Sequence, residues 1–247
     1  MSSTIELSQV RVDSPAGDAI LRDVSLTIAA GEAVALIGRS GAGKTTMLRL
    51  VNGLTRPSAG EVLVDGVSLS RTDLIALRRR TGYIIQGTGL FPHRTVLENI
   101  ATVPRLLGWP AERIRAAAEE TLARVGLPFE RFASRYPRSL SGGEQQRVGI
   151  VRAIVSGPSI LLCDEPFGAL DPIVRRDLQD VFMEFRRNVT VVFVTHDLAE
   201  ALRVAQRVIL VDDGRIVADA PAARFVREPL PLVQQFVASA TLPAGAA

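Results

Sequence analysis

The nonapeptide GRSGAGKTT at residues 38–46 is the strongest indication of the fold in this chain. It fits the pattern G-x-x-x-x-G-K-[ST], in which glycines let backbone N–H groups wrap a polyphosphate. The apolar run AVALIG (33–38) leads into it and predicts a buried strand, and MLRLVNGL (47–54) follows it with the spacing of a helix. The pattern requires this order of strand, glycine-rich loop and helix, so we expect a phosphate-binding loop here.

The loop contains Lys44, the only lysine in a chain with 29 lysine and arginine residues in total. Its compact ammonium suits a narrow phosphate pocket better than the wide planar fork of arginine. We expect Lys44 to reach the β- and γ-phosphates and the Thr45 hydroxyl to bind Mg²⁺, while the helix N-terminus adds a favourable dipole. The residues expected to bind the nucleotide are Gly38, Arg39, Ser40, Gly41, Ala42, Gly43, Lys44, Thr45 and Thr46.

The lysine count excludes one class of nucleotide-binding protein. Guanine-specific GTPases recognise their base with an N-K-x-D type motif, and no second lysine is present to build one. This argument does not exclude a small-molecule P-loop kinase, so the remaining motifs must decide.

The composition is ordinary for a soluble globular protein, with 47% hydrophobic and 22% charged residues and a formal net charge of +3 over 247 residues. The one tight basic run, residues 78–80, indicates a solvated helix end, so we expect no nucleic-acid partner. The single cysteine, Cys163, permits no intramolecular disulfide and suits a reducing cytosol. We see no leader segment and no apolar run near the ~18 residues that span a bilayer, so we expect any membrane attachment to come through another chain.

Further apolar runs predict a parallel sheet covered on both faces, because they are continuous and separated by helices. EVLVDG (61–66) alternates instead and predicts an edge or antiparallel strand. Between 95 and 156 the pattern is helical, most clearly at 110–126, which indicates a helical subdomain inserted in an α/β core. The runs that predict covered strands are GYIIQ (82–86), ILLCDE (160–165), VVFVTH (191–196) and VILVDD (208–213).

A second informative stretch is LSGGEQQRVGI, residues 140–150. Ser141 and Glu144 fit S-x-x-E, which is typical of an ordinary capping box. Gly142 and Gly143 would then lie in the first helical turn, where each glycine costs ~1 kcal/mol relative to alanine. A cap does not explain two glycines, whereas the close approach of an anionic ligand to the backbone does.

With this stretch the chain resembles the ATP-binding subunits of ABC transporters, whose signature begins LSGG. The resemblance covers residues 4 to about 237 and rests on several motifs in the family's order. It implies an α/β fold with a P-loop NTPase (RecA-like) core, a mostly parallel sheet, an N-terminal antiparallel β region and an inserted α-helical subdomain. The expected boundaries are a single ABC ATPase domain at 1–240, with a core at about 1–86 and 157–220, a helical subdomain at about 87–156, a C-terminal helix at about 221–240 and a flexible tail at 241–247.

The resemblance also implies ATP and Mg²⁺ as cofactors and a second copy of the chain as a partner. Ser141, Gly142 and Gly143 would contact the γ-phosphate of the ATP that is held by the second copy's loop. One loop and one signature per chain thus imply a head-to-tail dimer with two shared ATP sites. GALD (168–171) resembles the D-loop, so Asp171 would act across the dimer interface.

Two carboxylates, Asp164 and Glu165, end the strand expected at 160–165. Successive strand residues point to opposite sides, so the two side chains should have different roles. By the resemblance, Asp164 would hold Mg²⁺ and Glu165 would act as the general base that polarises the attacking water. The alternative is a satisfied buried acid pair with no catalytic role.

Gln86 and His196 also follow apolar strands. A lone histidine at a strand end is usually structural, but the position of His196 before Asp197 resembles that of the family's switch histidine, which would contact the γ-phosphate. Gln86 matches the glutamine that links Mg²⁺ and water to the helical subdomain. One family feature is missing: residues 12–14 contain no aromatic ring to stack on adenine, so we expect weak discrimination of the base.

Residues 84–109 and 164–179 resemble the ATPases of importers for quaternary-amine osmoprotectants such as glycine betaine, choline and carnitine. Gly87 and Arg94 depart from the commonest form, and the chain ends before the CBS regulatory pair of many members. The resemblance implies integral membrane permease subunits, indirectly an extracytoplasmic solute-binding protein, and a location on the cytoplasmic face of the cell membrane.

Four alternatives stay open on the sequence. The same ATPase could serve another cargo, in small-solute import or lipid trafficking, and residues 84–109 could serve only to pack the helical subdomain. A soluble ABC ATPase outside transport would usually carry two cassettes or a long coiled coil. An adaptor with inactive sites is disfavoured because Lys44, Glu165 and His196 are all present.

Overall fold

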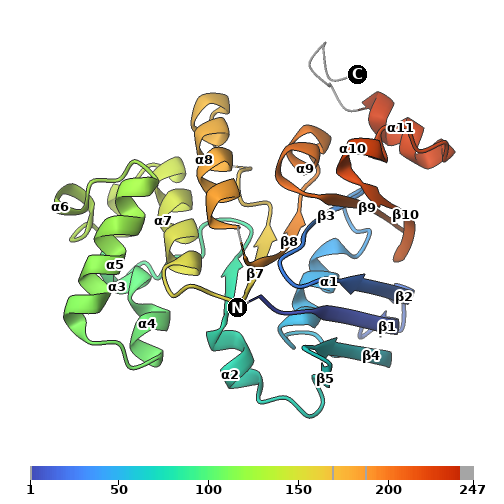
Figure 1. Ribbon diagram of the computed structural model, residues 1–247, viewed down its shortest axis with the longest axis horizontal. Coiled ribbons are helices and arrows are strands. Elements are labelled where there is room, and N and C mark those ends of the chain that lie inside the picture. Colours follow the sequence, from blue (N-terminus) through green and yellow to red (C-terminus); the bar gives the residue numbers. More distant parts are fainter. Residues whose placement is uncertain (1, 169, 187, 240–247) are drawn as a thin grey trace. The chain divides into compact units, whose positions relative to one another are not determined.

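The computed structural model describes residues 2–168, 170–186 and 188–239 (Figure 1). The chain forms two compact units, which we name by their motifs. The P-loop unit comprises the residues up to Leu74 and those from Asn188 onward, and the signature unit runs from Ile75 to Arg187. The division expected at 87 and 156 stays a prediction, and the tail expected at 241–247 lies outside the described residues.

An antiparallel sheet begins the P-loop unit, with the strand order β2-β1-β4-β5. Its inward residues on β1 alternate with exposed ones, as the pleat of a half-buried strand requires. The strand expected at 61–66 is β4, which pairs antiparallel with both β1 and β5 and therefore does not lie at the edge. The strands are β1 (Ile5–Asp13), β2 (Ala19–Ile28), β4 (Ala59–Val64) and β5 (Val67–Ser68).

The second sheet region of the P-loop unit has the order β10-β9-β3-β8. Strand β3 is parallel to both β8 and β9, and β9 forms an antiparallel hairpin with β10. Every residue of β3 and β8 is buried, which agrees with their continuous apolar sequences. These strands are β3 (Ala33–Ile37), β8 (Thr190–Val194), β9 (Arg207–Asp212) and β10 (Arg215–Pro221).

Helices of the P-loop unit follow its strands. Helix α1 (Lys44–Val51) continues directly from the glycine-rich loop, and α9 (Leu198–Val204) follows β8. Where the sequence predicts one C-terminal helix at about 221–240, the described residues form α10 (Ala222–Phe225) and α11 (Pro231–Ser239). Pro229 lies between the two helices, and proline disfavours helical backbone at the residue before it.

The signature unit contains the parallel strands β6 (Thr81–Ile84) and β7 (Ile160–Asp164) and a group of helices. Helix α7 packs so closely on β6 that a Cβ on Gly82 would collide with the Ala153 carbonyl. Figure 1 shows α3 to α7 gathered together, in green to yellow. The basic run 78–80 ends α2, as the sequence predicts. The helices are α2 (Leu74–Arg79), α3 (Val96–Ile100), α4 (Thr102–Leu106), α5 (Ala111–Arg124), α6 (Phe129–Phe132), a 3₁₀ turn (Pro137–Ser139), α7 (Gly142–Ile154) and α8 (Pro172–Phe185).

Candidate active site

The glycine-rich loop turns sharply between β3 and α1, and two of its glycines are required by the surrounding structure. Gly38 has φ 144°, and a Cβ there would collide with the Val211 carbonyl. Gly43 has φ 101°, and a Cβ there would lie 2.6 Å from Leu21 Cδ2. Gly43 is also the N-cap of α1 and has no side chain to cap that helix. The helix therefore presents its N-terminus to the loop, the geometry in which anions bind.

Lys44 lies over the loop that precedes it. Its Nζ donates hydrogen bonds to the carbonyl oxygens of Gly38 and Arg39, both at 2.7 Å, and the residue is only 8% exposed. A tetrahedral ammonium can make several such short bonds within a tight turn, whereas the planar guanidinium of arginine needs a wider space. The structure thus places the cation among the loop's own carbonyls.

His196 lies at the same edge of the P-loop unit as the glycine-rich loop. Strands β3 and β8 are parallel, with Leu36 beside Val194, so the residues that follow each strand emerge next to one another. The Thr195 N–H donates to the Leu36 carbonyl at 3.2 Å, and the next residue, His196, is exposed. The P-loop unit therefore brings His196 to the glycine-rich loop.

The buried pair of Thr195 and Glu200 fixes the backbone around His196. The sequence motifs predict a role for neither residue. The Thr195 hydroxyl donates to the Glu200 carboxylate at 2.7 Å and accepts from the Asp197 N–H at 3.0 Å. The Asp197 carboxylate caps α9 by accepting from the N–H groups of Ala199 (2.8 Å) and Glu200 (3.2 Å). Thr195 and Glu200 are 1% and 6% exposed, so this network holds the turn that carries the histidine.

The signature unit brings Gln86 and Glu165 together. Strands β6 and β7 are parallel, with Ile84 beside Cys163. Gln86 and Glu165 therefore both lie just beyond the carboxyl ends of these neighbouring strands. Gln86 Nε2 donates to Glu165 Oε2 at 3.4 Å. Asp164 is 4% exposed while Glu165 is half-buried, so the two neighbouring carboxylates lie in different environments. That they have different roles stays a prediction.

Cys163 precedes the two acids and is buried. Burial raises the pKa of its thiol well above the ordinary value, and the negative charge of Asp164 raises it further. The thiolate is the reactive form of cysteine, and the fully buried Cys163 side chain packs in the core as a small hydrophobe.

At the start of α7 the capping box predicted from S-x-x-E is present. The Ser141 hydroxyl accepts from the Glu144 N–H at 3.2 Å, and the Glu144 carboxylate accepts from the Ser141 N–H at 2.7 Å. The bond from the Ser141 N–H lowers the pKa of the Glu144 carboxyl. The cap does not explain Gly142, because a Cβ there would meet nothing within 4 Å, and a Cβ on Gly143 would make only an ordinary contact with Leu170 at 3.4 Å. The described residues therefore provide no internal reason for glycine at 142.

Asp171 ends the segment that resembles a D-loop and caps α8. Its carboxylate accepts from the N–H groups of Ile173 and Val174, both at 3.1 Å. Asp171 is exposed, and Ile173 is an exposed apolar side chain at 75%. Residue 169 of this segment lies outside the described residues.

The predicted magnesium ligands are all oxygen donors: the Thr45 hydroxyl, the Gln86 side-chain carbonyl and the Asp164 carboxylate. Hard oxygen ligands of this kind fit Mg²⁺, which prefers one or two carboxylates together with phosphate and water. Thr45 belongs to the P-loop unit and the other two to the signature unit. No cluster of three His, Cys, Asp or Glu side chains that could hold a metal occurs in the part of the chain that the structure describes.

No ring stands where the family places its adenine-stacking aromatic. Val12 is 4% exposed in β1 and packs into the core. The Asp13 carboxylate accepts from the Ser58 hydroxyl at 2.7 Å and from Arg11 at 2.9 Å, and the bond from Ser58 lowers its pKa. The side chain of Val12 therefore packs in the core, and that of Asp13 is bonded to Ser58 and Arg11.

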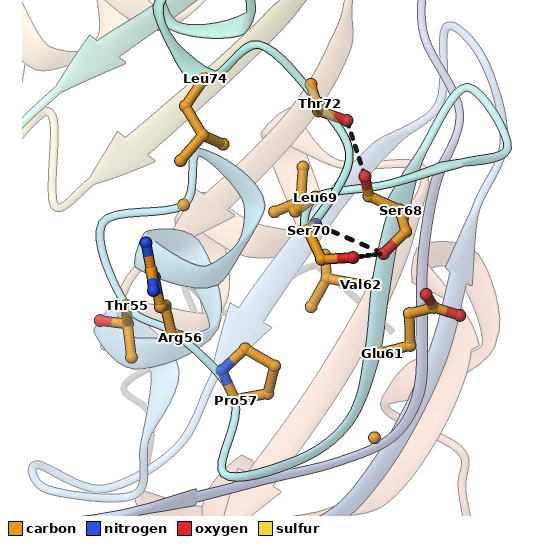
Figure 2. A pocket seen from close by; sticks show the side chains of 12 residues that line it. Thr55, Arg56, Pro57, Glu61, Val62, Ser68, Leu69, Ser70, Thr72 and Leu74 are labelled. Atoms are coloured by element: carbon orange, nitrogen blue, oxygen red, sulfur yellow. Dashed lines mark hydrogen bonds between the residues drawn. The ribbon is translucent and has the colours of Figure 1, made fainter.

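A cavity of about 610 Å³ in the P-loop unit lies apart from all the predicted site residues (Figure 2). Thr72 donates to the Ser68 carbonyl at 2.8 Å, and the Ser68 and Ser70 hydroxyls are 2.9 Å apart. These hydroxyls are thus bonded among themselves, and we assign the cavity no part in the site. Its lining residues are Gly53, Thr55, Arg56, Pro57, Gly60, Glu61, Val62, Ser68, Leu69, Ser70, Thr72 and Leu74.

Among the described residues, none of the helices combines the length and the apolar character needed to cross a bilayer.

A strand, a phosphate-binding loop and a helix beside parallel strands define a P-loop nucleotide-binding fold. Comparison with known proteins narrows this class. Residues 21–168 match the family described as ABC transporter. The chain belongs to the ABC transporter family.

Individual relatives agree with this assignment. The chain is 43% identical over 236 residues to the glycine betaine/carnitine/choline transport ATP-binding protein OpuCA of Bacillus subtilis, covering 94% of this chain and 62% of that protein. It is 44% identical over 229 residues to the methionine import ATP-binding protein MetN of Caulobacter vibrioides, covering 86% and 68%. The ATP-binding cassette MJ0796, solved as a dimer in a post-hydrolysis state bound to ADP and Pi, is 34% identical with a TM-score of 0.81, and the match covers 88% of this chain and 98% of that one. The chain thus spans about three fifths of the length of OpuCA.

Proposed function

We propose that this chain is the ATP-hydrolysing subunit of an ABC importer. The observation that carries the proposal is the glycine-rich loop. Gly38 and Gly43 have positive φ values there, and Lys44, the first residue of α1, donates a hydrogen bond to the Gly38 carbonyl. The family assignment and the ADP and Pi of the MJ0796 structure support ATP as the substrate.

Each catalytic group has a proposed task. The loop N–H groups and Lys44 bind the phosphates, and His196 contacts the γ-phosphate. Glu165 accepts a proton from the attacking water, and Gln86, 3.4 Å away, orients that carboxylate. Mg²⁺, held by Thr45, Gln86 and Asp164, would supply charge neutralisation at the phosphates.

We further propose that the ATPase works as a head-to-tail dimer of two copies. The signature glycine Gly142 is exposed and needed by nothing within its own unit, so a requirement for glycine there must come from outside. The N-terminus of α7 suits the γ-phosphate of a nucleotide held by the other copy. The dimeric structure of MJ0796 supports the pairing of two copies.

The partner in transport is proposed to be an integral membrane permease, with the ATPase on the cytoplasmic face and an extracytoplasmic solute-binding protein delivering the cargo. The proposed docking segment runs from Gln86 to Thr95. Within this segment the side chain of Phe91 is 38% exposed. Ile85, the residue just before the segment, is 36% exposed. Exposed apolar side chains next to a catalytic glutamine are what a coupling interface needs, since a partner's movement there would reach the site.

The cargo is proposed to be a quaternary-amine osmoprotectant. Residues 84–109 and 164–179 support this class, as does the similarity to OpuCA, a glycine betaine/carnitine/choline transport ATP-binding protein. The chain is similar to MetN at nearly the same identity, so methionine is the alternative cargo to be tested.

ATP is expected to be preferred over GTP by less than ~100-fold in affinity, or ~2.7 kcal/mol. The reason is that Val12 is buried and no ring from residues 12–14 can stack on the base. Equilibrium titration of the purified protein with both nucleotides measures the ratio. A larger preference would show that another group recognises adenine.

Deleting the gene is expected to abolish accumulation of radiolabelled glycine betaine, choline or carnitine. The wild-type gene should restore uptake, and the Lys44→Ala variant should not, because it lacks the phosphate-binding ammonium. Methionine uptake in the same strains provides the contrast. If methionine uptake alone is lost, the ATPase proposal stands and the quaternary-amine cargo is refuted.

A further inference from the structure

Helix α7 carries a buried glutamine on the face that packs inward. Gln146 is 2% exposed and lies one turn beyond the signature glycines, on the same helix face as the buried Ile150. A glutamine side chain has both donors and acceptors, so burying it is costly unless it is bonded. Its position is therefore explained by what its amide binds.

The amide of Gln146 holds the loop that carries the proposed catalytic base. Gln146 Nε2 donates to the Pro166 carbonyl at 2.6 Å, and this bond is buried. The Pro166 carbonyl belongs to the peptide group between Pro166 and Phe167, so the bond holds the backbone one residue beyond Glu165.

The backbone at that point needs to be held. Glu165 has φ 49°, in the left-handed region that residues with a Cβ rarely adopt. Such conformations persist where surrounding contacts enforce them. Besides the Gln146 bond, the Gly168 N–H donates to the Glu165 carbonyl at 3.3 Å, so the loop is fastened on both sides of Pro166.

We propose that Gln146 is a positioning residue that ties the signature helix to Glu165 and keeps the carboxylate in its productive orientation. This inference rests on the proposed ATPase function. The bond from Gln146 links the LSGG motif to the acidic pair of Asp164 and Glu165, because the helix that begins at LSGG also holds the loop that follows Glu165.

The neighbouring glutamine provides a matched control. Gln145 lies on the same helix, and its amide donates to the Leu140 carbonyl at 3.2 Å and accepts from the Thr88 hydroxyl at 3.3 Å. Neither bond reaches the Glu165 loop. A general loosening of α7 would follow from either substitution, whereas a positioning effect belongs to Gln146 alone.

The test compares Gln146→Met with Gln145→Met in the full-length protein. Methionine keeps the unbranched shape and removes the donor. Gln146→Met is expected to lower kcat about 10–100-fold, because small displacements of a catalytic group have effects of this order. The dissociation constant for ATP should change less than about twofold, and Gln145→Met should stay near wild type on both measures. Gln146→Asn, which keeps an amide but is one methylene shorter, provides a second variant with the same expected loss if Gln146→Met does not fold.

A double-mutant cycle with Glu165→Gln separates positioning from stability. If Gln146 acts through Glu165, then Gln146→Met should cause little further loss of single-turnover hydrolysis when the carboxylate is already absent. Full additivity, an equal loss in Gln145→Met, or wild-type kcat in both Gln146 variants would overturn the inference alone. A wild-type protein that hydrolyses no ATP would overturn the proposed function and this inference with it.

Discussion

Glu165→Gln is expected to lower ATP turnover by about 10²–10⁴-fold while ATP still binds. The amide has the same shape as the carboxylate but cannot accept a proton from water. Glu165 is half-buried at the end of β7, beside the Gln86 amide at 3.4 Å, so the substitution removes the base with little change in packing. Phosphate release measures turnover, and size-exclusion chromatography with ATP should show the variant trapped as an ATP-bound dimer.

The control for this variant is Glu130→Gln, the same chemical change elsewhere in the signature unit. The Glu130 side chain is 82% exposed and pairs with Arg115 at 3.4 Å, a surface contact worth little. Its turnover should match that of the wild type. Wild-type turnover in Glu165→Gln would remove this carboxylate from the mechanism and leave the acid pair with a structural role.

Much of the fold follows from local sequence, because the features that set it are local. The glycine-rich loop is predictable because Gly38 and Gly43 have positive φ values that the motif itself requires. The strands β3, β7 and β8 are buried on both faces, so their sequences are continuously apolar and easily recognised. The family assignment confirms the fold class that these signals indicate.

Other features depend on contacts that the local sequence pattern does not specify. Residues 61–66 alternate, which predicts an edge or antiparallel strand, and β4 is the antiparallel case, with β1 on one side and the two-residue strand β5 on the other. The bond from Gln146 to Pro166 joins residues 20 positions apart, and that from Thr195 to Glu200 depends on how the turn folds. The one available sequence signal for Gln146 is its inward position on a helix whose same face is apolar.

The signature helix shows how one sequence can support two readings at once. Ser141 and Glu144 form the capping box that S-x-x-E predicts, which taken alone is an ordinary helix start. Gly142 distinguishes the two readings, because an alanine there would be free of contacts and would favour the helix by ~1 kcal/mol. The described residues of this unit leave room for a side chain at position 142, which makes Gly142 the position at which to test the proposed shared site.

Gly142→Asp is expected to abolish ATP-dependent dimerisation while the protein stays folded. The new side chain meets nothing within 4 Å of its Cβ, and a carboxylate in the first turn of a helix is favourable. The same charge would repel the γ-phosphate of a nucleotide held by the second copy. Ala111→Asp, at the exposed first residue of α5, places the same charge at another helix start and should dimerise normally.

Mixing Gly142→Asp subunits with Lys44→Ala subunits tests whether each ATP site is shared. Either variant alone has two defective sites. In a head-to-tail heterodimer, one site would combine the intact loop of the first variant with the intact signature of the second. Mixing equal amounts should then restore up to about half of wild-type hydrolysis, since each mixed dimer has one whole site of its two and pairs of identical variants have none. If mixed dimers form, as detected with two different affinity tags, and still hydrolyse nothing, the loop and the signature do not complement each other across two copies.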